Sequence, residues 1–230
     1  MGSDGFYLRH TKEREKRKKD ILELRPNSWL IICEGSKTEP NYFYKAVEDF
    51  NKCNLLKSEL RVTIKGLGMN TTSLVKKADS LINEVDLFNN KIPLYEKIFV
   101  VFDKDDFSNS EFNSAIKMCK ENGFIALWSN QSFEYWLLLH FISFEGLLDR
   151  KDCIEKLNSE LRKKGYLKGY SKIDKNVYDI VTTYGSLECA RKNACKIHKN
   201  FNGSRISSAK AESCTTVYTF FDELEKRKIN

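Results

Sequence analysis

The sequence predicts an α/β fold: a mostly parallel four-stranded sheet with helices on both faces, followed by an α-helical annex. Three observations favour it. Four apolar or β-branched segments are predicted strands, at residues 28–33, 60–64, 98–102 and 124–128. Helical periodicity follows each of them, and strands that alternate with helices form parallel sheets. The remainder, residues 146–230, has helical patterns without a convincing strand.

Each element has a local signal. The first strand is a continuous apolar run, too short for a buried helix, which suits a strand covered on both faces. Pro40 then opens a helix, where its missing N–H is tolerated. Gly66 and Gly68 turn the chain before a helix that begins at Thr71 or Thr72. The later helices are predicted at residues 110–120, 133–142, 151–164, 187–200 and 214–226.

The chain is predicted to divide into a basic N-terminal arm (residues 1–25), an α/β core (26–145) and the helical annex (146–230). The arm has seven basic and two acidic residues between Arg9 and Lys19, and the whole chain carries a net charge of +7. This excess suits a nucleic-acid partner, although a solvated basic tail explains it equally well.

The cysteines and the hydropathy bear on location. The seven cysteines are scattered without the C-x-x-C spacing of a structural zinc site. They are typical of reduced thiols, which favours a cytoplasmic protein. No apolar run approaches the roughly 18 residues that a membrane span needs, so we expect no membrane partner.

Acidic residues directly follow two of the predicted strands: Glu34 the first, and Asp103 and Asp105 the third. Right-handed crossovers place the carboxyl ends of parallel strands at one edge, where ligands bind. Residues i and i+2 of extended chain point the same way, so Asp103 and Asp105 are expected to converge with Glu34. Oxygen ligands of this kind select Mg²⁺ or Mn²⁺.

Glu39 and Asp106 stand close to these residues in the sequence and are candidates for binding a second ion. A two-metal pair clamps the attacking and leaving oxygens in phosphodiester cleavage. The alternative is that the acidic segment after the third strand is only a charged turn. Because two acidic sites follow strand ends, we favour the metal site.

Further side chains are candidates near this edge. Glu134, in the first turn of a predicted helix, is expected to bind the second metal or orient water; the alternative is an acid favoured by the helix N-terminus. Lys37 is expected to neutralise the scissile phosphate, or else is simply solvated. The Ser129 hydroxyl either contacts a metal-bound water or caps the next helix. His140 is predicted to be a packed core histidine.

Two other patterns are weaker. The segment Gly66-Leu-Gly-Met-Asn-Thr71 opens a helix but lacks the third glycine of a dinucleotide-binding loop, so a tight turn explains it. The annex also mixes aromatic and basic residues, which would either stack nucleotides and grip their backbone or pack in a helix hairpin. These residues are Tyr166, Lys168, Tyr170, Lys172 and Lys175.

Three blocks carry a family resemblance: Cys33-Glu-Gly-Ser-Lys-Thr-Glu39, Phe102-Asp-Lys-Asp-Asp106, and Ser129-Asn-Gln-Ser-Phe-Glu-Tyr-Trp136 with His140-Phe141. They resemble the RloB-like family, bacterial proteins with a Toprim (topoisomerase-primase) core. Further blocks are Gly169-Tyr-Ser-Lys172, Ala190 with Asn193-Ala194, and Thr215-Thr-Val217. The resemblance covers about residues 30–220. One departure is that Glu212 and Ser213 stand where the family often has Asn-Pro.

The resemblance implies a Toprim-like fold, in which one Glu and an Asp-x-Asp pair hold Mg²⁺ for cutting or joining phosphodiesters. The matching residues are Glu34, Asp103 and Asp105. Relatives of this group act in phage defence, often beside an ABC-type ATPase, and some cut tRNA. We therefore expect a Mg²⁺-dependent endonuclease that acts on RNA, including tRNA, or on DNA in antiviral defence.

Two other classes of function are alternatives. The chain is alternatively an effector or nucleic-acid-binding module that a partner ATPase controls and that does not itself cleave. A nucleotidyl-transfer role like that of primases is less attractive, because the sequence has no zinc-binding module. Metal binding and template-dependent synthesis would separate these classes.

Overall fold

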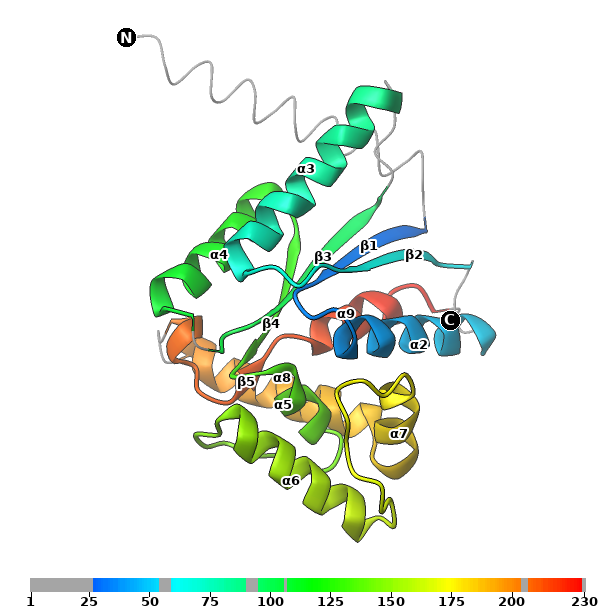
Figure 1. The fold of residues 1–230 in the computed structure, drawn as a ribbon, viewed down its shortest axis with the longest axis vertical. Coiled ribbons are helices and arrows are strands. Elements are labelled where there is room, and N and C mark those ends of the chain that lie inside the picture. Colours follow the sequence, from blue (N-terminus) through cyan, green and yellow to red (C-terminus); the bar gives the residue numbers. More distant parts are fainter. Residues whose placement is uncertain (1–26, 54–58, 90–94, 106, 204–206, 229–230) are drawn as a thin grey trace.

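The computed structural model describes residues 27–53, 59–89, 95–105, 107–203 and 207–228. The predicted basic arm and Asp106 lie outside the described residues. The described chain forms a mixed α/β fold around one mostly parallel sheet, consistent with the predicted Toprim-like class (Figure 1).

The sheet has the strand order β2-β1-β3-β4-β5. Its parallel strands are β1 (Ser28–Cys33), β2 (Arg61–Gly66), β3 (Lys97–Asp103) and β4 (Ile125–Asn130), close to the four predicted ranges. From β1 the chain moves outward to β2, and it then returns to build β3 and β4 on the other side of β1. The carboxyl ends of β1 and β3 therefore flank a topological switch point, the usual ligand position in such sheets.

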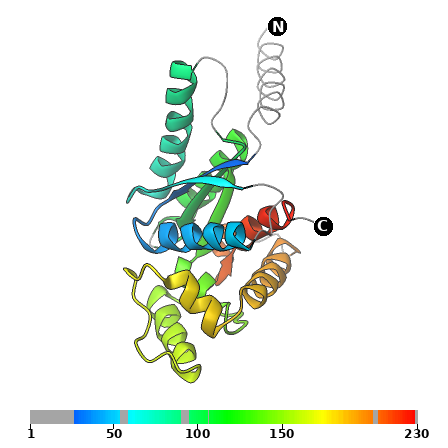
Figure 2. The same ribbon diagram turned by 90° about the vertical axis from the view of Figure 1, so that its right-hand side faces the viewer.

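Helices cover both faces of the sheet, as predicted. Helices α3 (Thr71–Asn89) and α4 (Asn109–Asn122) pack together on one face. Helix α2 (Thr38–Lys52) lies on the other face beside α9 (Tyr218–Glu225) (Figures 1 and 2). Helix α4 is delimited by strong local signals, because Ser108 and Glu111 form a capping box and Gly123 ends the helix at φ 69°.

The C-terminal region is mostly helical but also contributes a strand. Its helices are α6 (Arg150–Lys163), α7 (Val177–Tyr184), α8 (Leu187–Gly203) and α9, with a short 3₁₀ turn at Ser208–Lys210. Strand β5 (Cys214–Thr215) pairs antiparallel with β4. The expectation of a helix over residues 214–226, without any strand, was therefore wrong for its first residues. Helix α7 was not predicted.

One hydrophobic core joins the sheet to the C-terminal region. Phe220 of α9 is fully buried, and its ring lies 5.7 Å from Trp29 of β1 and 5.3 Å from Phe99 of β3, between centroids. It also lies 4.9 Å from Phe43 of α2. Burial of aromatic rings contributes most strongly to such cores. The end of the chain thus covers one face of the sheet.

Among the described residues, the helices are all too short or too polar to cross a membrane.

Candidate metal centre and its neighbours

A hollow of about 300 Å³ lies at the carboxyl edge of the sheet, over the switch point between β1 and β3. The sheet core contributes the loop after β1, the end of β3 and the start of α5 (Phe133–Leu138); the C-terminal region contributes the start of α6 and the segment before α7. The charged side chains that line it are Glu34, Lys37, Glu39, Asp103, Asp105, Glu134, Arg150 and Lys172.

Glu34 and Asp103 meet across the switch point. The backbone N–H of Glu34 donates to the Val101 carbonyl at 2.9 Å, which continues the pairing of β1 with β3. The backbone N–H of Asp103 donates to Glu34 Oε2 at 3.3 Å. The prediction that the sheet topology brings these two residues together is therefore confirmed for their positions.

Asp105 reaches the same hollow, but not along extended chain. Its φ is +36°, in the left-handed region that Asp tolerates better than most residues. Its backbone N–H donates to the Gln131 carbonyl at 3.0 Å, which holds the turn after β3 against the turn after β4. Asp105 therefore lies at the predicted edge of the sheet, but the predicted reason was wrong. A turn brings it there, and not the i, i+2 alignment of extended chain.

Glu39 and Glu134 add two buried carboxylates from helix starts. Glu39 lies in the first turn of α2, and Glu134 lies in the first turn of α5. The Tyr170 hydroxyl donates to Glu134 Oε1 at 3.0 Å, and Lys172 Nζ lies 3.3 Å from the same oxygen. Thr38 does not cap α2; its hydroxyl donates to the Lys172 carbonyl at 2.8 Å, which ties α2 to the segment before α7.

Arg150 is the site residue that sequence reasoning missed. Its guanidinium pairs with Asp105 through Nη2, and the same nitrogen lies 3.5 Å from Asp103 Oδ2. Arg150 and Asp105 are 45 positions apart, and no motif in the sequence links them. The sequence places Lys172 only in a mixed aromatic and basic segment, whereas in the structure it pairs with Glu134 in the hollow.

Burial and mutual repulsion disfavour ionised carboxylates here. Burial, followed by the charges of Asp105 and Glu39, raises the pKa of Glu34 from 4.5 to about 7, against the backbone hydrogen bond from Asp103. Burial raises the pKa of Asp103 well above its ordinary value, and Glu39, Glu134 and Asp105 add to the rise. The pKa values of Glu39 and Asp105 are also raised, primarily by burial.

The donor set of the hollow fits a hard divalent cation. Five described carboxylates line it against three cations, so the ionised hollow has an excess of two negative charges. An all-oxygen set suits Mg²⁺ or Mn²⁺. Among the described residues, however, no three acidic, His or Cys side chains already cluster as a ready metal site. Asp105 and Glu134 instead turn one oxygen each toward Arg150 and Lys172.

Comparison with known proteins places the chain in a family. The family model described as RloB-like protein matches residues 29–224. The chain belongs to the RloB-like family. No curated protein matches the chain, and no solved structure matches it either.

The remaining candidates of this RloB-like chain have distinct outcomes. Lys37 is exposed and lines the hollow, a position that fits both the phosphate role and the solvated lysine. Ser129 is buried, and its hydroxyl lies 3.0 Å from the Thr215 hydroxyl of β5, so it neither lines the hollow nor caps a helix. His140 is a core residue as predicted, because it is buried and its Nε2 lies 3.1 Å from the Tyr42 hydroxyl. Burial lowers its pKa to about 4.

Two weaker patterns also find structural explanations. A Cβ on Gly66 would lie 2.6 Å from the Gly35 carbonyl oxygen, so the turn after β2 lets the backbone pass close to the loop after β1. The ring of Tyr166 packs 5.2 Å from that of Tyr184, and Tyr170 bonds Glu134. These tyrosines are therefore engaged within the protein, as the packing interpretation expects, while Lys168 and Lys175 are exposed.

The raised pKa values predict how the stability of this RloB-like protein depends on pH without metal. The folded protein keeps protons on these carboxylates at a pH where the unfolded chain has released them. Their contribution is therefore complete below the unfolded pKa of Glu34, 4.5, and is lost as the pH rises through its folded pKa of about 7. The melting temperature in chelator should fall between about pH 5 and about pH 8.

The matched control for this melting experiment is Glu34→Gln, which removes one titrating group and should flatten the decline. Added Mg²⁺ should raise the melting temperature most at the alkaline end, because ligands bind best when deprotonated. A melting temperature that rises steadily with pH in chelator would contradict this account of the carboxylates.

Proposed function

We propose that this RloB-like protein is a metal-dependent endonuclease that hydrolyses phosphodiester bonds in nucleic acid. The observation that carries the proposal is the excess of two negative charges among oxygen ligands at the switch point of the sheet. Such a site attracts a divalent cation, and Mg²⁺ held by a few carboxylates typically grips substrate phosphates.

Glu34, Asp103 and Asp105 would hold the ion, with Glu39 and Glu134 available for a second one. A divalent ion bound there supplies Lewis acidity toward the phosphoryl oxygens and the attacking water. Lys37 would bind a non-bridging phosphate oxygen from the loop after β1. Asp106 is proposed for the second ion on the sequence alone, because it lies outside the described residues.

The proposed hydrolysis replaces one P–O bond with another and moves one proton to Glu34. Water attacks phosphorus, a new P–O bond forms, and Glu34 accepts the proton that the water loses. The bond to the leaving ribose or deoxyribose oxygen breaks, and that oxygen takes a proton from solvent. Glu34 is suited to this role by its place in the hollow, because a general base must lie within hydrogen-bond reach of the proton that it takes.

We also propose which nucleic acid is cut and in which cellular process. Membership of the RloB-like family, with the resemblance of its motifs, supports RNA, with tRNA as the first substrate to test, or DNA. It likewise supports a role in antiviral defence in the cytoplasm, beside a partner ABC-type ATPase. If the purified protein binds metal and nucleic acid yet cleaves only with such a partner, the alternative of a controlled effector is the better description.

The test is cleavage of a panel of total RNA, tRNA, single-stranded DNA and plasmid, with Mg²⁺ or with chelator, by wild type and by Glu34→Gln. We expect wild type to cut at least one member in Mg²⁺ only, and Glu34→Gln to leave it intact. Equal cleavage by both proteins would show that Glu34 is not in the active site. Sequencing RNA 5′ ends from cells that express each protein would then identify the cut site.

A further inference from the structure

We propose that Arg150, at the start of α6, is a substrate-binding residue that contacts the phosphate being cut. This inference rests on the proposed nuclease function and adds to it a residue from the C-terminal region. It follows that the C-terminal region completes the active site, which the sheet core alone would leave without this contact.

The position of Arg150 is set by the start of α6. Asp149 caps this helix, because its side chain accepts a hydrogen bond from the Asp152 backbone N–H at 2.7 Å. Arg150 is therefore the first helical residue, and its side chain extends to the carboxylates at the end of β3. Its side chain is 41% exposed, whereas that of Asp103 is 10% exposed. The guanidinium thus lies between the buried ligands and the open side of the hollow.

The contacts of Arg150 leave room for a metal. A single nitrogen, Nη2, makes both carboxylate contacts, and it uses only the Oδ2 atoms of Asp103 and Asp105. The backbone N–H of Phe133 also bonds the Asp103 carboxylate, which still keeps lone pairs for an ion, as does that of Asp105. A carboxylate can accept from a guanidinium and ligate an ion at once, because its two oxygens offer about four lone-pair sites.

The guanidinium also has unused donor capacity. Its Nε–H is buried and finds no hydrogen-bond partner among the described residues. A buried donor without a partner is costly, on the order of 1–3 kcal/mol. A phosphate oxygen that draws the guanidinium toward it and gives this N–H a partner would remove that cost. Arginine is suited to phosphate because its planar fork is permanently charged and binds two oxygens at once.

Charge balance favours the same assignment. With one divalent ion bound, the excess of two negative charges in the hollow is cancelled. The electrostatic attraction of Asp103 and Asp105 for Arg150 then weakens. The substrate phosphate becomes the nearest anion whose charge is not compensated. The competing explanation is that Arg150 only occupies the place of the ion, in which case removing it would help metal binding and cleavage.

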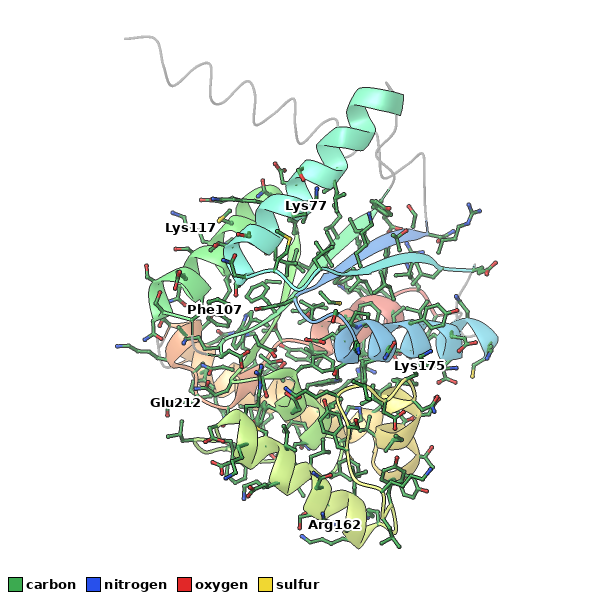
Figure 3. The ribbon with its side chains drawn as sticks, viewed as in Figure 1. Lys77, Phe107, Lys117, Arg162, Lys175 and Glu212 are labelled. Atoms are coloured by element: carbon green, nitrogen blue, oxygen red, sulfur yellow. The ribbon has the colours of Figure 1, made fainter. Side chains whose placement is uncertain are left out.

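The experiment compares Arg150→Ala, Arg150→Lys and Arg162→Ala with wild type on the RNA or DNA that wild type cuts, at saturating Mg²⁺ and across a Mg²⁺ titration. Arg162 is the matched control, because it is exposed at the far end of the same helix and does not line the hollow (Figure 3). We expect Arg150→Ala to lower the single-turnover rate about 100-fold. Arg150→Lys should recover part of it, since it keeps the charge but not the fork.

The Mg²⁺ concentration for half-maximal rate should stay close to that of wild type, and Arg162→Ala should cut normally. Cleavage by Arg150→Ala at the wild-type rate or faster would overturn the proposal, as would an equal loss in Arg162→Ala. Equal inactivity of Arg150→Ala and Arg150→Lys, with equally lowered melting temperatures, would assign Arg150 a structural role instead. Unimpaired cleavage by Glu34→Gln would instead sink the proposed function itself.

Discussion

Asp103→Asn is expected to lower the rate of nucleic-acid cleavage about 100- to 1,000-fold, the usual loss when a group that stabilises transition-state charge is removed. Asp103 is 7% exposed, and its backbone is fixed by pairing with β4 and by its N–H bond to Glu34. Its side chain lies 3.5 Å from Arg150 and lines the hollow. Asn keeps the shape of the side chain and loses the charge that a divalent ion requires.

The same variant should be at least as stable as wild type in chelator. Burial, together with Glu39, Glu134 and Asp105, raises the pKa of Asp103, so the ionised form is disfavoured in the metal-free protein. Asn cannot ionise, so repulsion from the neighbouring carboxylates does not develop at this position as the pH rises, and gains of this kind are common when active-site groups are replaced. Melting curves in chelator and in Mg²⁺ check this: Mg²⁺ should stabilise wild type and have little effect on Asp103→Asn.

Asp179→Asn is the matched control, because Asp179 is exposed on α7 and does not line the hollow. It should cleave like wild type. A cleavage rate of Asp103→Asn within a few-fold of that of Asp179→Asn would contradict the role assigned to the end of β3.

Phe220→Ala is expected to destabilise the protein by about 3–5 kcal/mol, the usual cost of truncating a buried Phe. The ring of Phe220 contacts Trp29, Phe43 and Phe99 and is fully buried. Its loss would leave a cavity between α9, α2 and the sheet. Denaturant unfolding gives the free energy directly, and Tyr44→Ala serves as the control, because Tyr44 is 63% exposed on α2 and should cost at most about 0.5 kcal/mol.

The packing of Phe220 also makes the C-terminal region part of the core of the sheet. If the C-terminal region completes the core, a chain that ends before residue 146 should fail to unfold cooperatively, because one face of the sheet would lose α9. A cost of under about 1 kcal/mol for Phe220→Ala would contradict this account. So would cooperative unfolding of the shortened chain.

The parallel strands and the meeting of Glu34 with Asp103 could be predicted from the sequence, because they follow from local patterns and general rules of topology. Apolar runs mark buried strands, and right-handed crossovers place their carboxyl ends together. Neither step requires knowledge of side-chain contacts between distant segments. The same holds for His140, whose spacing of six residues from Glu134 places it on another helix face.

The features that escaped prediction depend on long-range contacts. Strand β5 is only two residues long, and it exists because it pairs with Ser129 and Asn130 of β4. Arg150 reaches Asp105 across 45 positions of the chain. The turn that aims Asp105 is held by the Gln131 carbonyl. None of these leaves a periodic or compositional signal, since each partner is chosen by the fold.

The central claim is that Glu34, Asp103 and Asp105 hold a divalent ion over the switch point of the sheet. Calorimetric titration of Mn²⁺ into wild type and Asp103→Asn at neutral pH tests it most directly. The account predicts saturable binding to wild type and its loss in Asp103→Asn. Binding of equal strength to both proteins, or no binding to wild type, would contradict it.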